Sequence, residues 1–598
     1  MVRYIIFSLV LVIAYMLLSF FGNKYEKLFS KPWHRVEKWL WPVSLVFSVT
    51  ISTLFWVYNY LFMPTFAFDC PAIYIETILF LLIVVFSYVF VDSCGYFEDP
   101  WKYNKVYRWT TIGVFIGTGL FLLSGLYTWD FFHDSFKQSM LKVEQVDEDK
   151  NGLSPISVDK MCTVSPQVAQ RVILTKMGDL KNTYDIGEMT KQSFTGKFEA
   201  RTSDGQKVNI CYENHLIYVA VLEHKSFFTW SKQGYSPAYV IVDATDEHNA
   251  YVITEVNGEP LNIKYTEGAF WSYNLERHLR MNGYASIILD DFNIEIDENG
   301  RPFAPVTTLK NTIGFSTKDV TGVAVVDVQT GEINHYTPEN APAFVNRIYP
   351  EGVIYKRIYW WGDYKNGYFH WSNKTGLLQA CKGMDIVQTD NGCFYYVGVQ
   401  AQSDVVGTQG YMLVDIRTGK ARYFRRSGIS EQEAIRVLKA NTDLNLEINQ
   451  YVLTLTEPIF YNIEGLKTYF ATYVSTSDYT VKYYGFCSTD DKSVWGYGKT
   501  LEEAKASYLS SYYNEMTNKD IKFQTEDKHS IINVEAEILE KVQEGNAYYF
   551  RLKGYEGKTF FGYSSIIPDL RWKASKIKIS YNQTDNDMIV ISSYEKVE

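Results

Sequence analysis

The sequence predicts a membrane-anchored α+β protein with four transmembrane helices, then tandem helix-plus-antiparallel-sheet modules, and finally a small OB-like β-barrel. Three observations predict this order. Long apolar runs lie before Trp129, strand-and-turn sequence with recurring helix starts follows, and short alternating strands end the chain. At 598 residues the chain exceeds the roughly 250–300 residues of a single core, so several domains are expected.

The first region contains four apolar stretches, each long enough to cross the roughly 30 Å hydrocarbon core of a bilayer as a helix. They cover residues 3–22, 39–62, 72–91 and 109–129. The first stretch has no small-x-small cleavage site, so we expect it to be retained. Basic residues fall in the loops after the first and third stretches, which favours a cytoplasmic position for both loops.

This charge pattern predicts a multi-pass protein of the cytoplasmic membrane, with the lipid bilayer as a partner. The N-terminus and the large C-terminal region would then both be extracytoplasmic. The net charge of -10, without a Lys/Arg-rich tract, argues against a nucleic-acid partner, because phosphate binding requires a cationic surface.

The body that follows contains a recurring hairpin whose first strand is apolar and ends in Val-Asp. The aspartates of the three plain copies are Asp243, Asp327 and Asp415. An aspartate there can accept hydrogen bonds from backbone N–H groups two residues on, and the glycine of Asp-x-x-Thr-Gly tolerates a positive φ. We therefore interpret these aspartates as turn formers and not as catalytic residues.

A second recurring element is a helix start, in which Ser or Thr precedes acidic or amide residues and then Ala. The five copies are Ser165–Ala169, Thr266–Ala269, Thr337–Ala341, Ser430–Ala434 and Thr500–Ala504. Successive copies lie about one helix plus one small sheet apart, which predicts an array of α+β modules.

The helix start Ser430-Glu-Gln-Glu-Ala434 and the hairpin from Val326 to Glu332 resemble PepSY-type domains, and degenerate units of this kind cover residues 154–518. The resemblance implies one helix packed on a curved antiparallel sheet, and inhibition or regulation by binding, on the outer side of a bacterial membrane or in a secreted protease propeptide, without catalytic residues. The expected division is a transmembrane region, four stretches of modules and a barrel, over 1–130, 131–260, 261–336, 337–428, 429–524 (two modules) and 525–598.

The C-terminal region alternates polar and apolar residues in five short segments separated by Gly, Asp and Asn turns. They are residues 530–541, 547–552, 558–563, 576–581 and 588–593. Five short strands predict the OB-like barrel, for which we favour a structural or protein-binding role.

The search for catalytic chemistry yields no catalytic residue and no cofactor-binding motif. The nine His are scattered, and no His-Glu-x-x-His, Gly-x-Ser-x-Gly, P-loop or paired-Cys zinc motif is present. A convergent triad remains open. Among the seven Cys, a disulfide such as Cys381–Cys393 is conceivable, but the spacing does not specify it.

One segment matches the opening of a calcium loop, because Asp147, Asp149 and Asn151 alternate before Gly152. The twelfth position, where a bidentate Glu is needed, is Val158. A calcium site and a polar linker turn both fit this segment, so calcium is the one possible cofactor.

An aromatic cluster surrounds the turn predicted at Asn366-Gly367. A sugar or peptide could bind it, or the side chains could pack across a hairpin. The residues proposed as this binding surface are Tyr359, Trp360, Trp361, Tyr364 and Trp371.

Three functions are therefore compatible with the sequence. The leading hypothesis is a non-catalytic, bacterial or phage-encoded envelope protein whose modules bind or regulate another protein or a cell-wall component. The alternatives are a membrane-tethered extracytoplasmic hydrolase with a convergent site, and a structural scaffold subunit of a membrane assembly. The sequence does not identify the partner or the oligomeric state.

Overall fold

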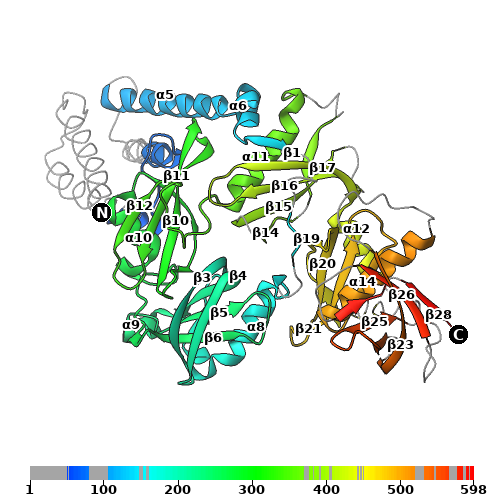
Figure 1. Ribbon diagram of the computed structural model, residues 1–598. Coiled ribbons are helices and arrows are strands. Elements are labelled where there is room, and N and C mark those ends of the chain that lie inside the picture. The colour runs from blue at the N-terminus through cyan, green and yellow to red at the C-terminus, as the bar shows by residue number, and fades with distance from the viewer. Residues whose placement is uncertain are drawn as a thin grey trace, which may run out of the picture.

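The computed structural model describes the body of the chain and short parts of its first 100 residues (Figure 1). The described residues are 50, 53–54, 56–79, 82, 105–146, 153–156, 160–369, 376–381, 383–389, 392–402, 407–440, 444, 448, 450, 452–518, 531–544, 547–563, 567, 576–582, 588–591 and 593–597. They form a mixed α/β structure built mostly from five sheets.

Within these ranges, no helix combines at least 18 residues with the apolar content that a membrane crossing requires. The predicted fold class with four transmembrane helices is therefore wrong. The same finding contradicts the multi-pass localisation and the description of the chain as a transmembrane protein.

The predicted spans are only partly described. Residues 3–22 lie outside the described residues, and 39–62 and 72–91 are described in part. Helix α5 (Lys105–Tyr127) covers most of the fourth stretch, but Lys105 and Arg108 lie in its first turn. Glycine, serine and threonine then interrupt its apolar residues. The prediction counted apolar runs and gave these interruptions too little weight.

Short elements lead from α5 into the body. They are η1 (Asp130–Phe132), α6 (Asp134–Ser139) and β1 (Val143–Val146). Strand β1 pairs in parallel with β17 (Ala421–Ile429), far along the chain, so this segment is the edge strand of the sheet that contains β17.

Module 1, residues 160–260, has the strand order β2-β4-β3-β6-β5, and β4 also pairs with β5, so its long strands close on themselves. Helix α8 begins where predicted, because Ser165 Oγ accepts the Val168 N–H at 3.4 Å. The elements are α8 (Pro166–Lys176), η3 (Gly178–Asn182), β2 (Tyr184–Ile186), β3 (Thr190–Thr202), β4 (Lys207–His224), α9 (Phe227–Gln233), β5 (Tyr239–Asp243), β6 (Ala250–Val256) and β7 (Glu259–Pro260).

Modules 2, 3 and 4 share one topology, in which two short strands pair with the same long strand and two more strands follow antiparallel. Module 2 contains η4 (Trp271–Tyr273), α10 (Leu275–Leu279), η5 (Arg280–Tyr284), β8 (Ile288–Phe292), β9 (Glu295–Ile296), β10 (Pro302–Ile313), β11 (Ser316–Asp327) and β12 (Ile333–Tyr336). Module 3 contains α11 (Glu351–Asp363), η6 (Tyr364–Asn366), β13 (Leu378–Ala380), β14 (Asp385–Thr389), β15 (Gly392–Ala401), β16 (Gly407–Asp415) and β17.

Module 4 contains α12 (Glu431–Lys439), β18 (Leu453–Leu455), β19 (Ile459–Ile463), β20 (Leu466–Ser475), β21 (Val481–Ser488), β22 (Trp495–Gly498) and α14 (Leu501–Asn518). Its helix α12 is capped as predicted, since Ser430 Oγ accepts the Glu433 N–H at 3.2 Å. The helix predicted at Thr500 is α14.

The turn aspartates act as the sequence predicts. Asp243 Oδ1 accepts the Thr245 N–H, Asp327 Oδ1 that of Gln329, and Asp415 Oδ1 that of Arg417, at 2.8–2.9 Å. In each of these modules the carbonyl that follows the aspartate also accepts two consecutive N–H groups from the segment before the module's helix. The donors are Thr163 and Val164, Lys264 and Tyr265, and Ile348 and Tyr349. This shared bond pattern supports a repeated architecture.

Two of the five predicted helix starts are turns. At Thr337 the Asn340 N–H donates to the Thr337 carbonyl, and Pro342 follows before a helix could continue. Near Thr266, Asn274 caps the short α10 instead, through the Arg277 N–H at 3.1 Å. Helices α9 and α11 lack the predicted start pattern.

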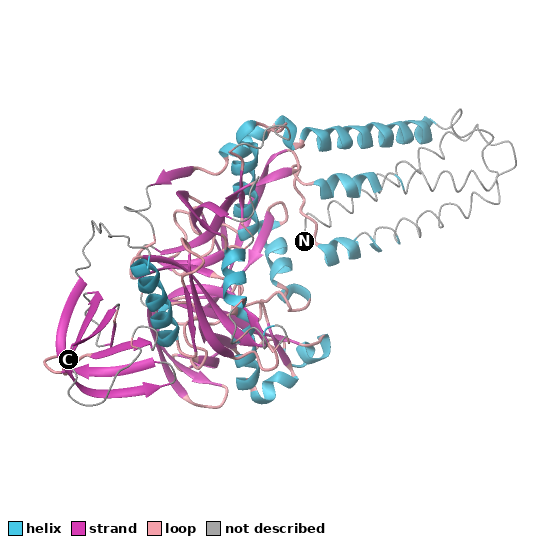
Figure 2. Cartoon of the chain, turned by 90° about the vertical axis from the view of Figure 1, so that its right-hand side faces the viewer, coloured by secondary structure: helices cyan, strands magenta, loops and turns pink. Residues whose placement is uncertain are grey.

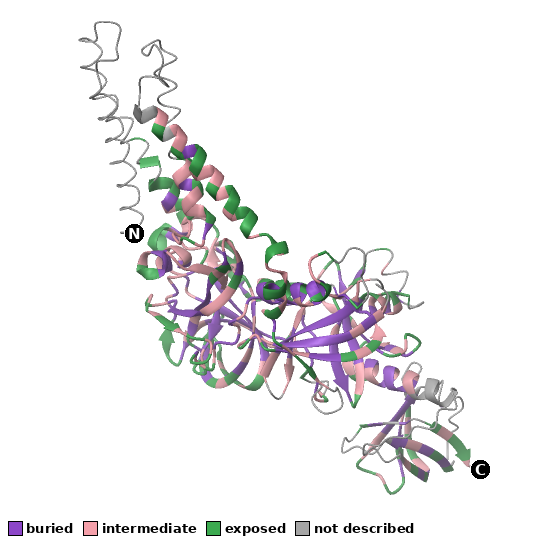
Figure 3. Ribbon diagram, turned by 90° about the horizontal axis from the view of Figure 1, so that it is seen from above, coloured by how far each residue is buried: buried purple, intermediate pink, exposed green. Residues whose placement is uncertain are grey.

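The four modules form two pairs. Modules 1 and 2 share one apolar core, which includes Phe194, Ile241, Ala304 and Val326. Modules 3 and 4 share another, which includes Phe460. We call modules 1 and 2 lobe A, and modules 3 and 4 lobe B. Figure 3 shows that the buried residues follow the central strands of these sheets.

The C-terminal strands form a six-stranded sheet with the order β27-β25-β24-β23-β26-β28, whose two ends are consecutive in the chain. Figure 2 shows this sheet at the opposite end of the body from α5. The strands are β23 (Ile531–Glu544), β24 (Ala547–Leu552), β25 (Thr559–Tyr563), β26 (Lys576–Asn582), β27 (Met588–Val590) and β28 (Ser593–Val597). They enclose an apolar core of their own.

Candidate functional site

A connecting segment between the two lobes forms the centre of the candidate site. Residues 337–350, which we call the strap, run from β12 to α11 without regular secondary structure. Ala341, Val345 and Ile348 of the strap are buried against Val323 and Val325 of β11. The strap therefore covers the face of module 2 that no long helix covers.

Two side-chain amides bind backbone in the way a neighbouring strand would. Asn346 Oδ1 accepts the Ser193 N–H at 3.2 Å, and its Nδ2 donates to the Ser193 carbonyl at 3.1 Å. Gln192 forms the same pair of hydrogen bonds with Ile296: its Oε1 accepts the Ile296 N–H at 3.0 Å, and its Nε2 donates to the Ile296 carbonyl at 2.7 Å. Both amides are buried, so these bonds join β3, the strap and β9 at defined positions.

A buried carboxyl group fixes the strap to module 2. The two oxygens of Glu295, which is fully buried, accept the Asn346 N–H at 2.7 Å and the Arg347 N–H at 3.3 Å. Burial raises the pKa of Glu295 to about 7, although these hydrogen bonds act in the opposite direction. The Arg347 side chain pairs with Asp291 at 2.7 Å.

Further polar contacts connect module 1 with module 3. Lys191 Nζ lies 2.7 Å from Asp385 Oδ1. Gln388 Nε2 donates to Ser193 Oγ at 3.1 Å and to the Asn214 carbonyl at 2.5 Å. An apolar contact between the lobes lies elsewhere, where Val474 joins the core of module 1.

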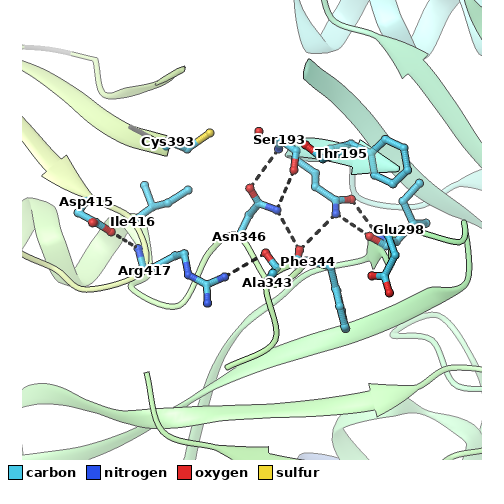
Figure 4. A pocket seen from close by; sticks show the side chains of 14 residues that line it. Ser193, Thr195, Glu298, Ala343, Phe344, Asn346, Cys393, Asp415, Ile416 and Arg417 are labelled. Carbon is cyan, nitrogen blue, oxygen red and sulfur yellow. Dashed lines mark hydrogen bonds between the residues drawn. The ribbon is translucent and has the colours of Figure 1, made fainter. Parts of the chain in front are cut away.

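A cavity of about 490 Å³ lies at this junction. Its volume falls in the range of small-ligand sites, which is roughly 300–1,000 Å³. The wall comes from lobe A, the strap and lobe B: Gln192, Ser193, Phe194, Thr195, Ile296, Glu298, Ala343, Phe344, Asn346, Gly392, Cys393, Asp415, Ile416 and Arg417 (Figure 4). Phenylalanine and isoleucine side chains thus alternate with polar groups.

Arg417 supplies a positive charge to the cavity wall. Its Nη1 donates to the carbonyls of Pro342, Ala343 and Val345, and its Nη2 to that of Ala341 at 2.9 Å. Within the described part of the chain, Nε makes no hydrogen bond and no carboxylate pairs with this guanidinium. Burial lowers the pKa of Arg417, but a guanidinium stays charged at neutral pH.

Two carboxylates also line the cavity and differ in their bonding. Asp415 Oδ1 accepts two N–H groups of its own turn, from Arg417 and Thr418. Glu298 is exposed, and its contact with the Asn299 amide is long, at 3.5 Å. Figure 4 shows Arg417 and Glu298 on opposite sides of Asn346.

Among the described residues, Ser193 and Cys393 of the wall have no hydrogen bond to an activating base. Ser193 Oγ contacts the amides of Asn214 and Gln388. Burial raises the pKa of the Cys393 thiol to about 12, so the thiol stays protonated at neutral pH. Neither group has the environment that nucleophilic catalysis requires.

A histidine–aspartate pair includes His215, the strand partner of the lining residue Phe194. His215 Nε2 is 2.7 Å from Asp243 Oδ1, and Thr245 Oγ1 is 3.5 Å from the same nitrogen. In a triad the carboxylate and the hydroxyl bind opposite ring nitrogens. Burial acts to raise the pKa of Asp243, but the hydrogen bonds from His215 and Thr245 outweigh it and lower this pKa. We therefore interpret the pair as stabilising the turn between β5 and β6.

The predicted aromatic surface lies away from this cavity and is mostly packed. The four of its residues that are described lie in α11 and η6, not in a hairpin, because Ile354, Ile358 and Trp361 recur at helical spacing. Trp360 is 2% exposed, with Lys137 Nζ 5.3 Å from its ring, and Tyr364 donates to Asp130.

Within the same cluster, Trp361 packs on Tyr423 with ring centroids 5.4 Å apart. Tyr359 is 45% exposed, and Trp371 lies outside the described residues. The four described residues therefore do not form one open face, since Trp360 and Tyr364 are buried.

The possible calcium ligands Asp147, Asp149 and Asn151 also lie outside the described residues. Among the residues that are described, no group of three or more His, Cys, Asp or Glu is arranged to hold a metal ion. The cysteines at 70, 162, 211, 381, 393 and 487 are free.

Most cavity residues belong to no recognisable motif, and Asp415, which belongs to the recurring hairpin, was predicted only as a turn former. A signal does exist at the second position after each turn aspartate, which is Thr245, Gln329 and Arg417 in the three copies. The only charged residue among these three lines the cavity. No protein-family model matches the sequence, and no curated protein matches it significantly.

Proposed function

We propose that this chain is a non-catalytic binding protein whose paired modules hold a ligand, or a segment of another protein or cell-wall component, at the junction between lobes A and B. The observation that supports this proposal is the cavity of about 490 Å³ at the strap. Its amides are engaged in holding the wall together, while its charged ends remain available to a ligand.

Binding at a junction between rigid units is a common solution, because both units contribute to the ligand's surroundings. The PepSY-like character of the modules stays part of this proposal, since binding without catalysis is what that resemblance implies. The His215–Asp243 geometry gives the hydrolase alternative no support.

The test uses the full chain and an equimolar pool of synthetic peptides two to ten residues long. Native mass spectrometry reports which peptides bind, and chromatography reports whether they are recovered intact. We expect intact peptides to bind, and binding to disappear in Ala343→Trp, whose new side chain fills the cavity from an exposed position.

Ala440→Trp is the matched control, because Ala440 is also exposed but lies at the end of α12. Cleaved peptides would contradict a non-catalytic function. Peptide binding that is equally strong in Ala343→Trp would contradict the junction as the binding site.

A further inference from the structure

We propose that the junction cavity binds a short zwitterionic peptide in extended form, with its carboxylate on Arg417 and its ammonium group on Glu298. This inference rests on the proposed binding function and adds the chemical class of the ligand. It depends on the charged groups of the wall and on the apolar surface between them.

Among the residues that the structure describes, one edge of the Arg417 guanidinium is free to bind a ligand. The bonds to the strap carbonyls use Nη1 and one hydrogen of Nη2. Nε and the second Nη2 hydrogen lie on one edge of the planar guanidinium, and they make no hydrogen bond among the described residues. Two parallel N–H donors on one edge match the two oxygens of a carboxylate.

The positive charge of Arg417 has no directly bonded carboxylate among the described residues. A partly buried guanidinium normally has a carboxylate partner, because desolvation penalises an uncompensated charge. Among the described residues Arg417 bonds directly only to carbonyl oxygens; Glu295 and Asp415 act on its charge without forming an ion pair with it, and Asp415 Oδ1 is bonded to its own turn. A ligand carboxylate would supply a directly bonded anionic partner.

The Glu298 carboxylate lines the opposite end of the cavity. Glu298 belongs to lobe A and Arg417 to lobe B, so a ligand that meets both must cross the junction. A purely anionic ligand would be repelled by Glu298, whereas a peptide's terminal ammonium group, charged at pH 7, would be attracted. The two ends therefore favour a zwitterion.

The wall between these ends selects the side chains. Phe194, Ile296, Phe344 and Ile416 line the cavity, and the backbone-binding amides of Gln192 and Asn346 are already engaged. Burying apolar ligand atoms there removes them from water and favours binding. Short peptides with apolar side chains fit this wall.

The experiment is isothermal titration calorimetry on the full chain with leucine, leucyl-leucine and trileucine, to find the length that fits. The best of these is compared with its N-acetylated form and its C-terminal amide. We expect each blocked form to bind at least about tenfold more weakly, since one charge contact is lost.

Two variants assign the ends. Arg417→Gln should abolish the preference for the free acid over the amide, and Glu298→Gln should abolish the preference for the free amine over the acetylated form. A structural role for either residue would weaken all forms alike. The controls Arg436→Gln and Glu332→Gln remove the same charges at exposed positions and should keep both preferences.

The inference is overturned if the free and blocked forms bind equally, or if either preference survives in its variant. It is also overturned if none of the three leucine compounds binds. The proposed function would still stand in those cases if other peptides of the pool bind at the junction, so the two failures are distinguishable.

Discussion

Modules 3 and 4 meet through a shared apolar core, whereas beside the strap lobes A and B meet through amides and an ion pair around a cavity, with a separate apolar contact at Val474. Phe460 is an example of the first kind, stacked on Tyr396 at 4.8 Å between the two sheets. Lys191, paired with Asp385, and Gln388, which donates to Ser193 and Asn214, are examples of the second. The apolar junction joins two sheets into one unit, while the polar junction sets an orientation and leaves space.

This difference follows from general energetics. Apolar burial is roughly proportional to area and tolerates no void, because each lost contact reduces dispersion. A hydrogen bond contributes only about 1 kcal/mol net, but it is costly to leave unmade. The lobe junction is therefore specific in its geometry and less strongly held, which suits a site that must admit a ligand.

The largest expected effect is at the apolar junction. Phe460→Ala removes a ring that is 2% exposed and packed among three tyrosines. We expect a loss of about 4 kcal/mol in the free energy of unfolding of lobe B. Urea denaturation followed by tryptophan fluorescence measures it, and a loss below about 1 kcal/mol would remove the contrast between the junctions.

The next effect is where the strap is held on module 2, beside the lobe junction. Arg347→Gln breaks the pair with Asp291, in which both side chains are less than one-fifth exposed. We expect a cost of about 3 kcal/mol, because the remaining carboxylate is left buried without its partner.

Lys318→Gln provides the matched comparison, since the Lys318–Asp290 pair is 48% and 37% exposed. Its loss should cost below about 1 kcal/mol in the same denaturation experiment. Equal effects of the two substitutions would show that the Arg347–Asp291 pair is not protected from solvent.

A smaller effect depends on pH. The pKa of Glu295 is raised by burial from its ordinary 4.5 to about 7. Between these values the folded protein keeps the proton that the unfolded chain releases, so stability falls as pH rises through this window. We expect wild type to lose on the order of 2 kcal/mol more than Glu295→Gln between pH 4.5 and pH 8.

Glu332→Gln, at an exposed position, should keep the wild-type pH dependence. Unfolding free energies of the three proteins at both pH values decide the matter. An identical slope in wild type and Glu295→Gln would mean that Glu295 is ionised in the folded protein throughout.

The smallest effect concerns the turn beside Arg417. Asp415→Ala removes the acceptor for two N–H groups, whereas Asp415→Asn keeps an oxygen there. We expect a cost of about 1 kcal/mol for alanine and less for asparagine, measured by thermal unfolding. Equal costs would indicate that the charge of Asp415, and not the hydrogen bonds, holds the turn.

The sequence predicted those parts of the fold that depend on neighbouring residues. Ser165 and Ser430 cap helices because their side chains reach N–H groups three residues away. Asp243, Asp327 and Asp415 form turns for the same local reason. The helix start predicted at Thr337 was wrong because Pro342, which lies outside the start pattern, prevents a helix from continuing.

The site could not be predicted because its residues meet only in the folded chain. Asn346 lies 153 positions from Ser193, and Arg417 lies more than 70 positions from the strap carbonyls that it binds. The aromatic cluster was conspicuous in the sequence, yet Trp360 and Tyr364 pack against α6 and η1. Aromatic density alone did not distinguish a buried helix face from a binding surface.

Hydrogen exchange with mass spectrometry, on the full chain with and without leucyl-leucine at saturation, tests the central claim most directly. Ligand binding at the lobe junction should slow exchange in the strap, where the Asn346 and Arg347 N–H groups donate to Glu295, and leave β23 and β26 of the C-terminal sheet unchanged. Protection of β23 and β26 without protection of the strap would contradict a ligand site at the junction.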